Sequence, residues 1–128
     1  MKPKNLKEFK ALKKRYESIT LDEIKNTDVS LPNTADVLRI AVLQARGVYG
    51  QKANILTGFG ASSTCTLCIK DGEEVDCDDC VYIIETGDDC YSGDNHETYH
   101  NIMCAKTSKQ LLNAFRARAK HMKTLINL

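Results

Sequence analysis

The chain has 128 residues, a formal net charge of +1, 42% hydrophobic residues and no tryptophan. This length predicts a single domain, residues 1–128, with a modest hydrophobic core. No segment approaches the roughly 20 consecutive apolar residues of a membrane helix, and the basic N-terminus lacks the apolar stretch of a signal peptide. We therefore expect a cytoplasmic protein with no membrane partner.

The near-neutral total hides a strong segregation of charge along the chain. Residues 1–64 carry 11 basic and 6 acidic side chains, and residues 101–128 carry 6 basic and no acidic ones. Residues 65–100 carry 11 acidic side chains against Lys70 alone. Either these regions neutralise one another inside one fold, or they face partners of opposite charge.

The first part of the chain reads as helical. An amphipathic helix is predicted over about residues 4–18, because apolar residues recur there at helical spacing: Leu6, Phe9, Leu12, Tyr16 and Ile19. Thr20 and Glu23 have the spacing of a capping box, which predicts a short second helix. A third helix is predicted from Thr34 to near Gly47.

All six cysteines lie between residues 65 and 104. Cys65 with Cys68, and Cys77 with Cys80, form two C-x-x-C pairs, a pattern typical of zinc ligands. The loop between the pairs contains Asp71-Gly72, a favoured hairpin turn, so a β-hairpin would bring the pairs together around one tetrahedral ion. A reducing cytosol favours thiolates holding a metal over the alternative, three disulfides.

The segment after Cys80 is short and apolar at residues 81–84, which predicts either a strand or one buried helical turn. A polar turn at residues 86–89 then delivers Cys90. Further on, Thr107 and Gln110 repeat the capping-box spacing. The apolar residues that follow predict a long closing helix: Leu111, Leu112, Phe115, Ala119, Met122, Leu125 and Ile126.

Residues 96–100 read His-Glu-Thr-Tyr-His and match the zinc-hydrolase motif, in which two histidines bind zinc and the glutamate is the general base. No acidic residue follows Glu97, so the usual downstream glutamate ligand is missing. A second structural metal site, made by His96 and His100 with Cys90 and Cys104, is favoured over a hydrolase. Histidines without a metal are favoured over both.

The cysteine pattern also resembles a family. The matching segments are Cys65–Cys68, Cys77–Tyr82, Thr86–Cys90 and Thr98-Tyr99. Over residues 65–125 the chain is similar to small cysteine-rich zinc-binding proteins of tailed phages. The resemblance implies a phage origin, hence the host-cell cytoplasm, and it adds Cys90 to the candidate zinc ligands. It implies no reaction.

Together these features predict a mainly α fold with a small metal-stapled β-hairpin. The helices of residues 1–64 and the closing helix of residues 107–126 would pack around a cysteine-rich zinc unit at residues 65–104. The predicted cofactor is Zn²⁺, and the predicted ligands are five cysteines: Cys65, Cys68, Cys77, Cys80 and Cys90.

The predicted function is binding rather than catalysis. We expect a zinc-stabilised accessory protein that docks on a host or phage macromolecule and inhibits, for example, a host enzyme or defence system. The docking surface would be the acidic segment: Asp71, Glu73, Glu74, Asp76, Asp78 and Asp79.

Two alternatives stay open. One is a zinc hydrolase that uses Glu97. The other is weak nucleic-acid binding through basic residues of the terminal helices: Lys7, Lys10, Lys14, Arg116, Lys120 and Lys123.

Overall fold

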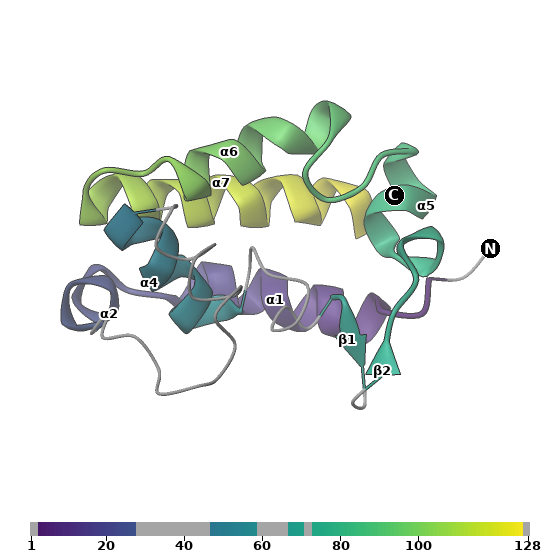
Figure 1. Cartoon of the computed structure of the whole chain (residues 1–128), viewed down its shortest axis with the longest axis horizontal. Coiled ribbons are helices and arrows are strands. Elements are labelled where there is room, and N and C mark those ends of the chain that lie inside the picture. The colour runs from purple at the N-terminus through teal and green to yellow at the C-terminus, as the bar shows by residue number, and fades with distance from the viewer. Residues whose placement is uncertain (1–2, 28–46, 59–66, 71–72, 127–128) are drawn as a thin grey trace.

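The computed structural model describes residues 3–27, 47–58, 67–70 and 73–126. The elements are α1 (Leu6–Ser18), α2 (Leu21–Asn26), α4 (Gly47–Thr57), β1 (Ile69–Lys70), β2 (Glu73–Glu74), η1 (Cys77–Asp79), α5 (Val81–Thr86), η2 (Gly93–Asn95), α6 (His96–Met103) and α7 (Ser108–Ile126). The chain is mainly helical, as predicted (Figure 1). None of the described helices is long and apolar enough to cross a membrane.

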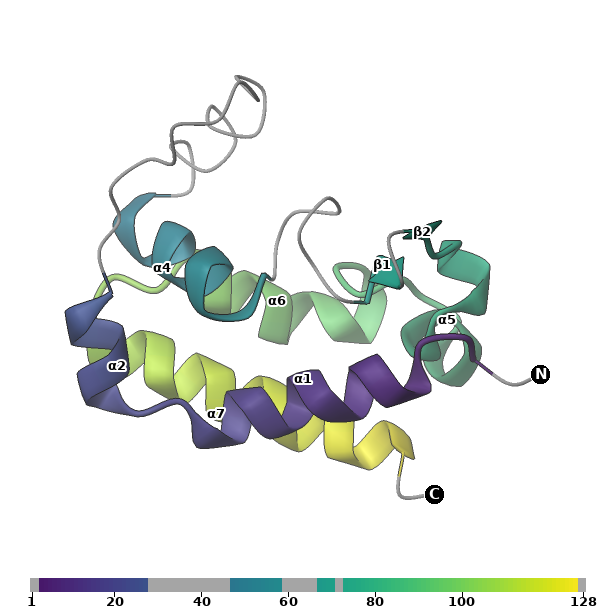
Figure 2. The ribbon, with the colours of Figure 1, turned by 90° about the horizontal axis from the view of Figure 1, so that it is seen from below.

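The helices form two layers. Helices α1, α2 and α7 lie along one side of the molecule, and α4, α6 and the β1–β2 pair lie on the other (Figure 2). α7 is the central element, because it contacts α1, α2, α4, α5 and α6. The two predicted terminal helices therefore pack directly against each other.

The core lies between these layers and is built from the predicted apolar faces. α1 buries Phe9, Leu12 and Tyr16, while Leu6 is 36% exposed. The ring of Tyr16 stacks on Phe115 of α7 with 5.3 Å between centroids. The apolar stripe of α1 thus begins one turn later than predicted, and each fully buried large side chain contributes roughly 1.5–3 kcal/mol to folding.

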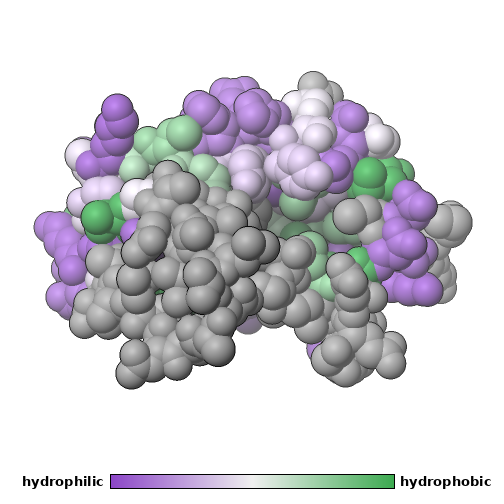
Figure 3. Space-filling model, in the orientation of Figure 1, coloured by the Kyte–Doolittle hydropathy of each residue, from purple (hydrophilic) through white to green (hydrophobic). Residues whose placement is uncertain are grey.

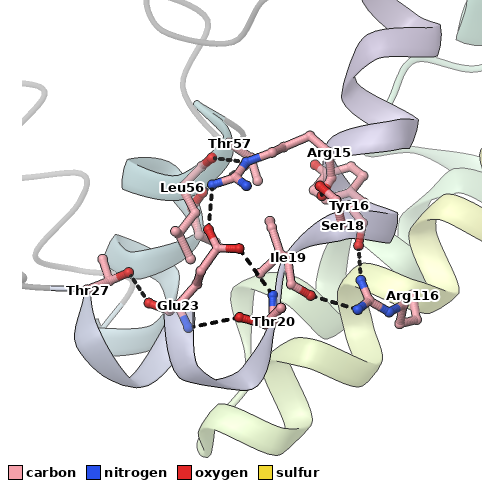
Figure 4. Close-up of polar contacts among 11 residues, drawn as sticks. Arg15, Tyr16, Ser18, Ile19, Thr20, Glu23, Thr27, Leu56, Thr57 and Arg116 are labelled. Carbon is pink, nitrogen blue, oxygen red and sulfur yellow. Dashed lines mark hydrogen bonds and ion pairs between the residues drawn. The ribbon is translucent and has the colours of Figure 1, made fainter.

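Polar contacts fasten the N-terminal helices (Figure 4). The predicted capping box of α2 is present: the Glu23 N–H donates to Thr20 Oγ1 at 3.2 Å, and the Thr20 N–H donates to Glu23 Oε1 at 3.4 Å. Arg116 of α7 donates to the carbonyls of Tyr16 and Ile19, the latter at 2.7 Å. Arg116 was predicted to contact nucleic acid, but its guanidinium binds the end of α1.

Helix α4 was not predicted. Its buried residues are small or polar: Gly50, Lys52, Ala53, Asn54 and Thr57. The Lys52 ammonium donates to the Ile24 carbonyl at 2.8 Å and lies 5.3 Å from the centroid of the Tyr49 ring. This face has no apolar period for a sequence pattern to detect. The helix predicted from Thr34 to Gly47 lies outside the described residues, apart from its last position.

Between residues 81 and 86 the apolar run is the helix α5 rather than a strand. It ends at Gly87, whose φ of 80° is left-handed and suits glycine. The predicted closing helix is α7, with its capping threonine in place: the Gln110 N–H donates to Thr107 Oγ1 at 3.0 Å.

Candidate metal centre

Three of the five predicted cysteine ligands lie in one region beside the core. Cys68 precedes β1, Cys80 is the N-cap of α5, and Cys90 lies in the turn before η2. All three are half-buried, packed against the core cluster and present as thiols. The charges of Cys68 and Cys80 act on Cys90, so the three sulfurs share one neighbourhood.

In this neighbourhood the Cys90 thiol resists ionisation. Burial is the main cause and raises its pKa from 9.0 to about 12. The Arg118 guanidinium opposes this, while Cys68, Cys80 and Asp89 raise the pKa further. A bound divalent cation would instead favour the ionised form of Cys90, because a thiol that coordinates a metal loses its proton.

A buried amide holds the centre together. Asn5 is fully buried and directly precedes α1. Its Nδ2 donates to Cys80 Sγ at 3.0 Å and to the Leu67 carbonyl at 3.0 Å. Its Oδ1 accepts from the Val81 N–H at 3.0 Å. One side chain therefore fixes the backbone next to both Cys68 and Cys80, and donors to ligand atoms are the usual outer partners of metal ligands.

Arg118 is the second residue that the sequence analysis missed. It is fully buried, and its guanidinium lies 4.5 Å from the centroid of the Tyr82 ring. It donates to the Cys90 carbonyl at 2.8 Å and to Thr98 Oγ1 at 2.7 Å. Its position in the sequence could have indicated its burial, because it lies three residues after Phe115 on the apolar face of α7.

The structure describes a short antiparallel pair where the hairpin was predicted, and the hairpin itself stays a prediction. Ile69 pairs with Glu74 and Lys70 with Glu73 in an antiparallel ladder, and the Val75 N–H donates to the Cys68 carbonyl at 2.7 Å. The turn at residues 71–72, Cys65 and the side chain of Cys77 lie outside what the structure describes. Within the described part of the chain, no three His, Cys, Asp or Glu side chains are placed to hold one ion. The metal staple stays a prediction.

No protein-family model, no curated protein and no solved structure matches the chain. The likeness to cysteine-rich phage proteins therefore rests on the cysteine pattern alone.

The four residues predicted to form a second metal site do not all lie together. His96 and His100 lie one turn apart on α6, with ring centroids separated by 5.5 Å. His100 Nδ1 lies 3.6 Å from Cys104 Sγ, whereas Cys90 lies with Cys68 and Cys80. Glu97 is exposed on the same helix.

The two predicted charged surfaces are adjacent at the start of α1. The basic residues of the terminal helices are exposed on α1 and α7, which lie side by side in the layer away from the β1–β2 pair (Figure 2): Lys7, Lys10, Lys14, Arg116, Lys120 and Lys123. In the acidic segment Asp76 and Asp78 are exposed, while Asp79 pairs with Lys4 at 3.4 Å. The side chains of Asp71, Glu73 and Glu74 are not described.

Proposed function

We propose that this chain is a zinc-stabilised protein that acts by binding another macromolecule. The structural zinc would be held by Cys68, Cys80 and Cys90, together with Cys65 or Cys77 of the paired motifs. The observation that carries the proposal is that Cys68, Cys80 and Cys90 come from separate turns of the chain to one region beside the core, where the Asn5 amide donates to Cys80 Sγ at 3.0 Å. When bound, zinc would supply the positive charge that keeps these sulfurs ionised in a half-buried place.

The donor set fits zinc better than other common ions. Thiolates are soft ligands that favour zinc over magnesium or calcium. A closed set of thiolates leaves no position open for a substrate, which is the arrangement of a structural site. The protein would gain stability from it, since metal bound only by the folded state adds its binding energy to folding.

Metal content and melting temperature test this proposal. Cys80→Ser should lose tightly bound zinc and melt at a lower temperature, and chelation of the wild-type protein should have the same effect. Ala11→Ser is the control, because Ala11 is exposed on α1 and belongs to neither group of candidate ligands. A protein that is purified without zinc and melts identically with and without chelator would refute the structural zinc.

The acidic segment favours a partner of opposite charge, namely a basic surface on a host or phage protein. Asp76 and Asp78 project into solvent, and the one ion pair that the described residues place here joins Asp79 to Lys4. Asp76→Lys/Asp78→Lys should keep zinc but lose the partner captured from phage-infected cells. Capture of the same partner at the same salt concentration would remove this segment from the interface.

A second candidate is nucleic-acid binding through the other layer. What supports it is that α1 and α7, which both carry exposed lysines, pack against each other, because contact with a phosphate backbone requires such lysines on one continuous face. Such binding would be independent of sequence and would weaken steeply as salt rises. We rank it second because Arg116, at the seam of the two helices, already binds main-chain carbonyls.

A further inference from the structure

The exposed pair of His100 and Cys104 lies at the end of α6. Cys104 is the C-cap of the helix, and its N–H donates to the His100 carbonyl at 2.8 Å. This bond fixes the two backbones relative to each other. The two side chains then meet on the surface, since both residues are exposed. In Figure 3, the upper edge of the molecule, where α6 lies in Figure 1, shows hydrophilic residues beside a pale hydrophobic patch.

The separation of the two potential donors matches the edge of a zinc tetrahedron. Zinc bonds of about 2.0–2.1 Å to nitrogen and about 2.3 Å to sulfur, at a tetrahedral angle, separate the two ligands by about 3.5–3.6 Å. His100 Nδ1 and Cys104 Sγ are 3.6 Å apart. We propose that His100 and Cys104 form a second metal site, for zinc or a similar divalent ion, distinct from the structural centre.

The end of a helix favours a cation at this place. The last carbonyls of α6 have no partner further along the helix, and they carry partial negative charge toward Cys104. A bare thiolate would be repelled there, but a metal bound to it would be attracted. An imidazole and a thiolate together also suit zinc, cobalt or copper better than magnesium or calcium.

The site is open, in contrast to the proposed structural centre. No third ligand joins His100 and Cys104 among the residues that the structure describes. Both residues line a cavity of about 410 Å³, together with Asn101, Gln110 and Asn113. The remaining coordination positions would therefore hold water or a small ligand, and the ion would exchange with solvent.

His96 has a supporting position rather than a ligand position. Its Nδ1 lies 3.0 Å from the Tyr91 carbonyl oxygen. A carbonyl can only accept, so Nδ1 carries the proton and orients the ring. This ring stacks on His100. His96→Ala should weaken the second ion without removing its site.

Cobalt titration, followed by the thiolate-to-cobalt charge-transfer absorption, separates the sites. His100→Ala and Cys104→Ser should each bind one ion fewer than the wild-type protein, whereas His96→Ala should bind the same number. If the structural centre does not exist, all four proteins bind one ion fewer. The wild-type protein still binds one ion more than His100→Ala. Equal numbers of ions in wild type and both ligand variants would overturn the second site.

Site-resolved alkylation gives an independent measurement. Iodoacetamide should modify Cys104 in the metal-free protein, and zinc should protect it. The protection should disappear in His100→Ala, in which the exposed Cys104 is otherwise unchanged. Modification of wild-type Cys104 at the same rate with and without zinc would also overturn the proposal.

Discussion

Substitutions of Asn5 test the metal centre most directly, because its amide oxygen and amide nitrogen make different contacts. Oδ1 and one Nδ2 bond hold the backbone at Val81 and Leu67, while the other Nδ2 bond reaches the sulfur of Cys80. Asn5→Ala removes all of these bonds. Asn5→Asp keeps the shape and the acceptor for Val81, but replaces the donor to the Cys80 sulfur and to the Leu67 carbonyl with a carboxylate oxygen.

The two variants should differ in magnitude and in kind. Asn5→Ala leaves two backbone groups without this partner, the Leu67 carbonyl and the Val81 N–H. Each unsatisfied buried group costs roughly 1–3 kcal/mol, and water that reaches the site would reduce this cost. We therefore expect the free energy of unfolding to fall by about 2–4 kcal/mol. For a domain of this size that corresponds to a melting temperature lower by roughly 7–15 °C. Asn5→Asp sets a negative charge against the Cys80 sulfur and should weaken zinc binding about 10–100-fold.

A change in the capping of α1 would not explain a lower zinc affinity of Asn5→Asp. The Asn5 side chain makes no capping bond to α1. Aspartate is also a favourable residue at the start of a helix, so any capping effect would stabilise Asn5→Asp. Loss of zinc affinity must then come from the changed contacts with the Cys80 sulfur and the Leu67 carbonyl.

Zinc affinity by chelator competition and thermal melts with and without zinc measure both effects. Asn26→Asp, at an exposed asparagine at the end of α2, is the control for added charge. If Asn5→Asp binds zinc as tightly as this control, Asn5 does not contact a metal-bound sulfur. If Asn5→Ala is destabilised equally with and without zinc, its role is in folding alone.

Three further outcomes are expected. Glu97→Gln should leave zinc content and melting temperature unchanged, and peptidase activity that vanishes in this variant would reverse our ranking of binding over hydrolysis. Lys120→Glu/Lys123→Glu should abolish any low-salt binding to DNA or RNA in a filter assay, while binding that persists would place the contact elsewhere. Without metal, the raised pKa of Cys90 stabilises the fold below about pH 9, and that contribution is lost as pH rises toward about 12. Melts across this range should therefore fall more steeply than in Cys90→Ser.

The parts of the fold that could be predicted from the sequence depend on local signals. α1 and α7 carry apolar residues at helical spacing, and α2 has its capping box within four residues. These signals require no knowledge of what the helix packs against. The mainly helical class followed from them and is confirmed.

The parts that could not be predicted depend on partners far away in the chain. Lys52 is buried in α4 because the Ile24 carbonyl accepts from it. Arg118 is buried in α7 because the carbonyls of Cys90 and Asn95, with the ring of Tyr82, surround its guanidinium. The sequence alone marks both positions as charged and therefore as exposed.

The candidate site divides in the same way. The C-x-x-C spacing predicts that Cys68 and Cys80 are near each other, since a short hairpin joins them. The arrival of Cys90 depends on the turn at Gly87 and on its carbonyl accepting from Arg118. The family resemblance placed Cys90 with Cys68 and Cys80, whereas the positions of the residues in the sequence left Cys90 open to the second site with His96 and His100.

Asn5 and Arg118 together connect the cysteine unit to both terminal helices. Asn5 holds it at the start of α1, and Arg118 holds it from the middle of α7. Because α1 and α7 also pack on each other, the cysteine unit is fastened to a single helical body at two points. A metal that tightens Cys80 and Cys90 would therefore stabilise the helical layers as well as the loops that carry the ligands. The exposed lysines of α1 and α7 and the acidic segment would then be stabilised by the same ion.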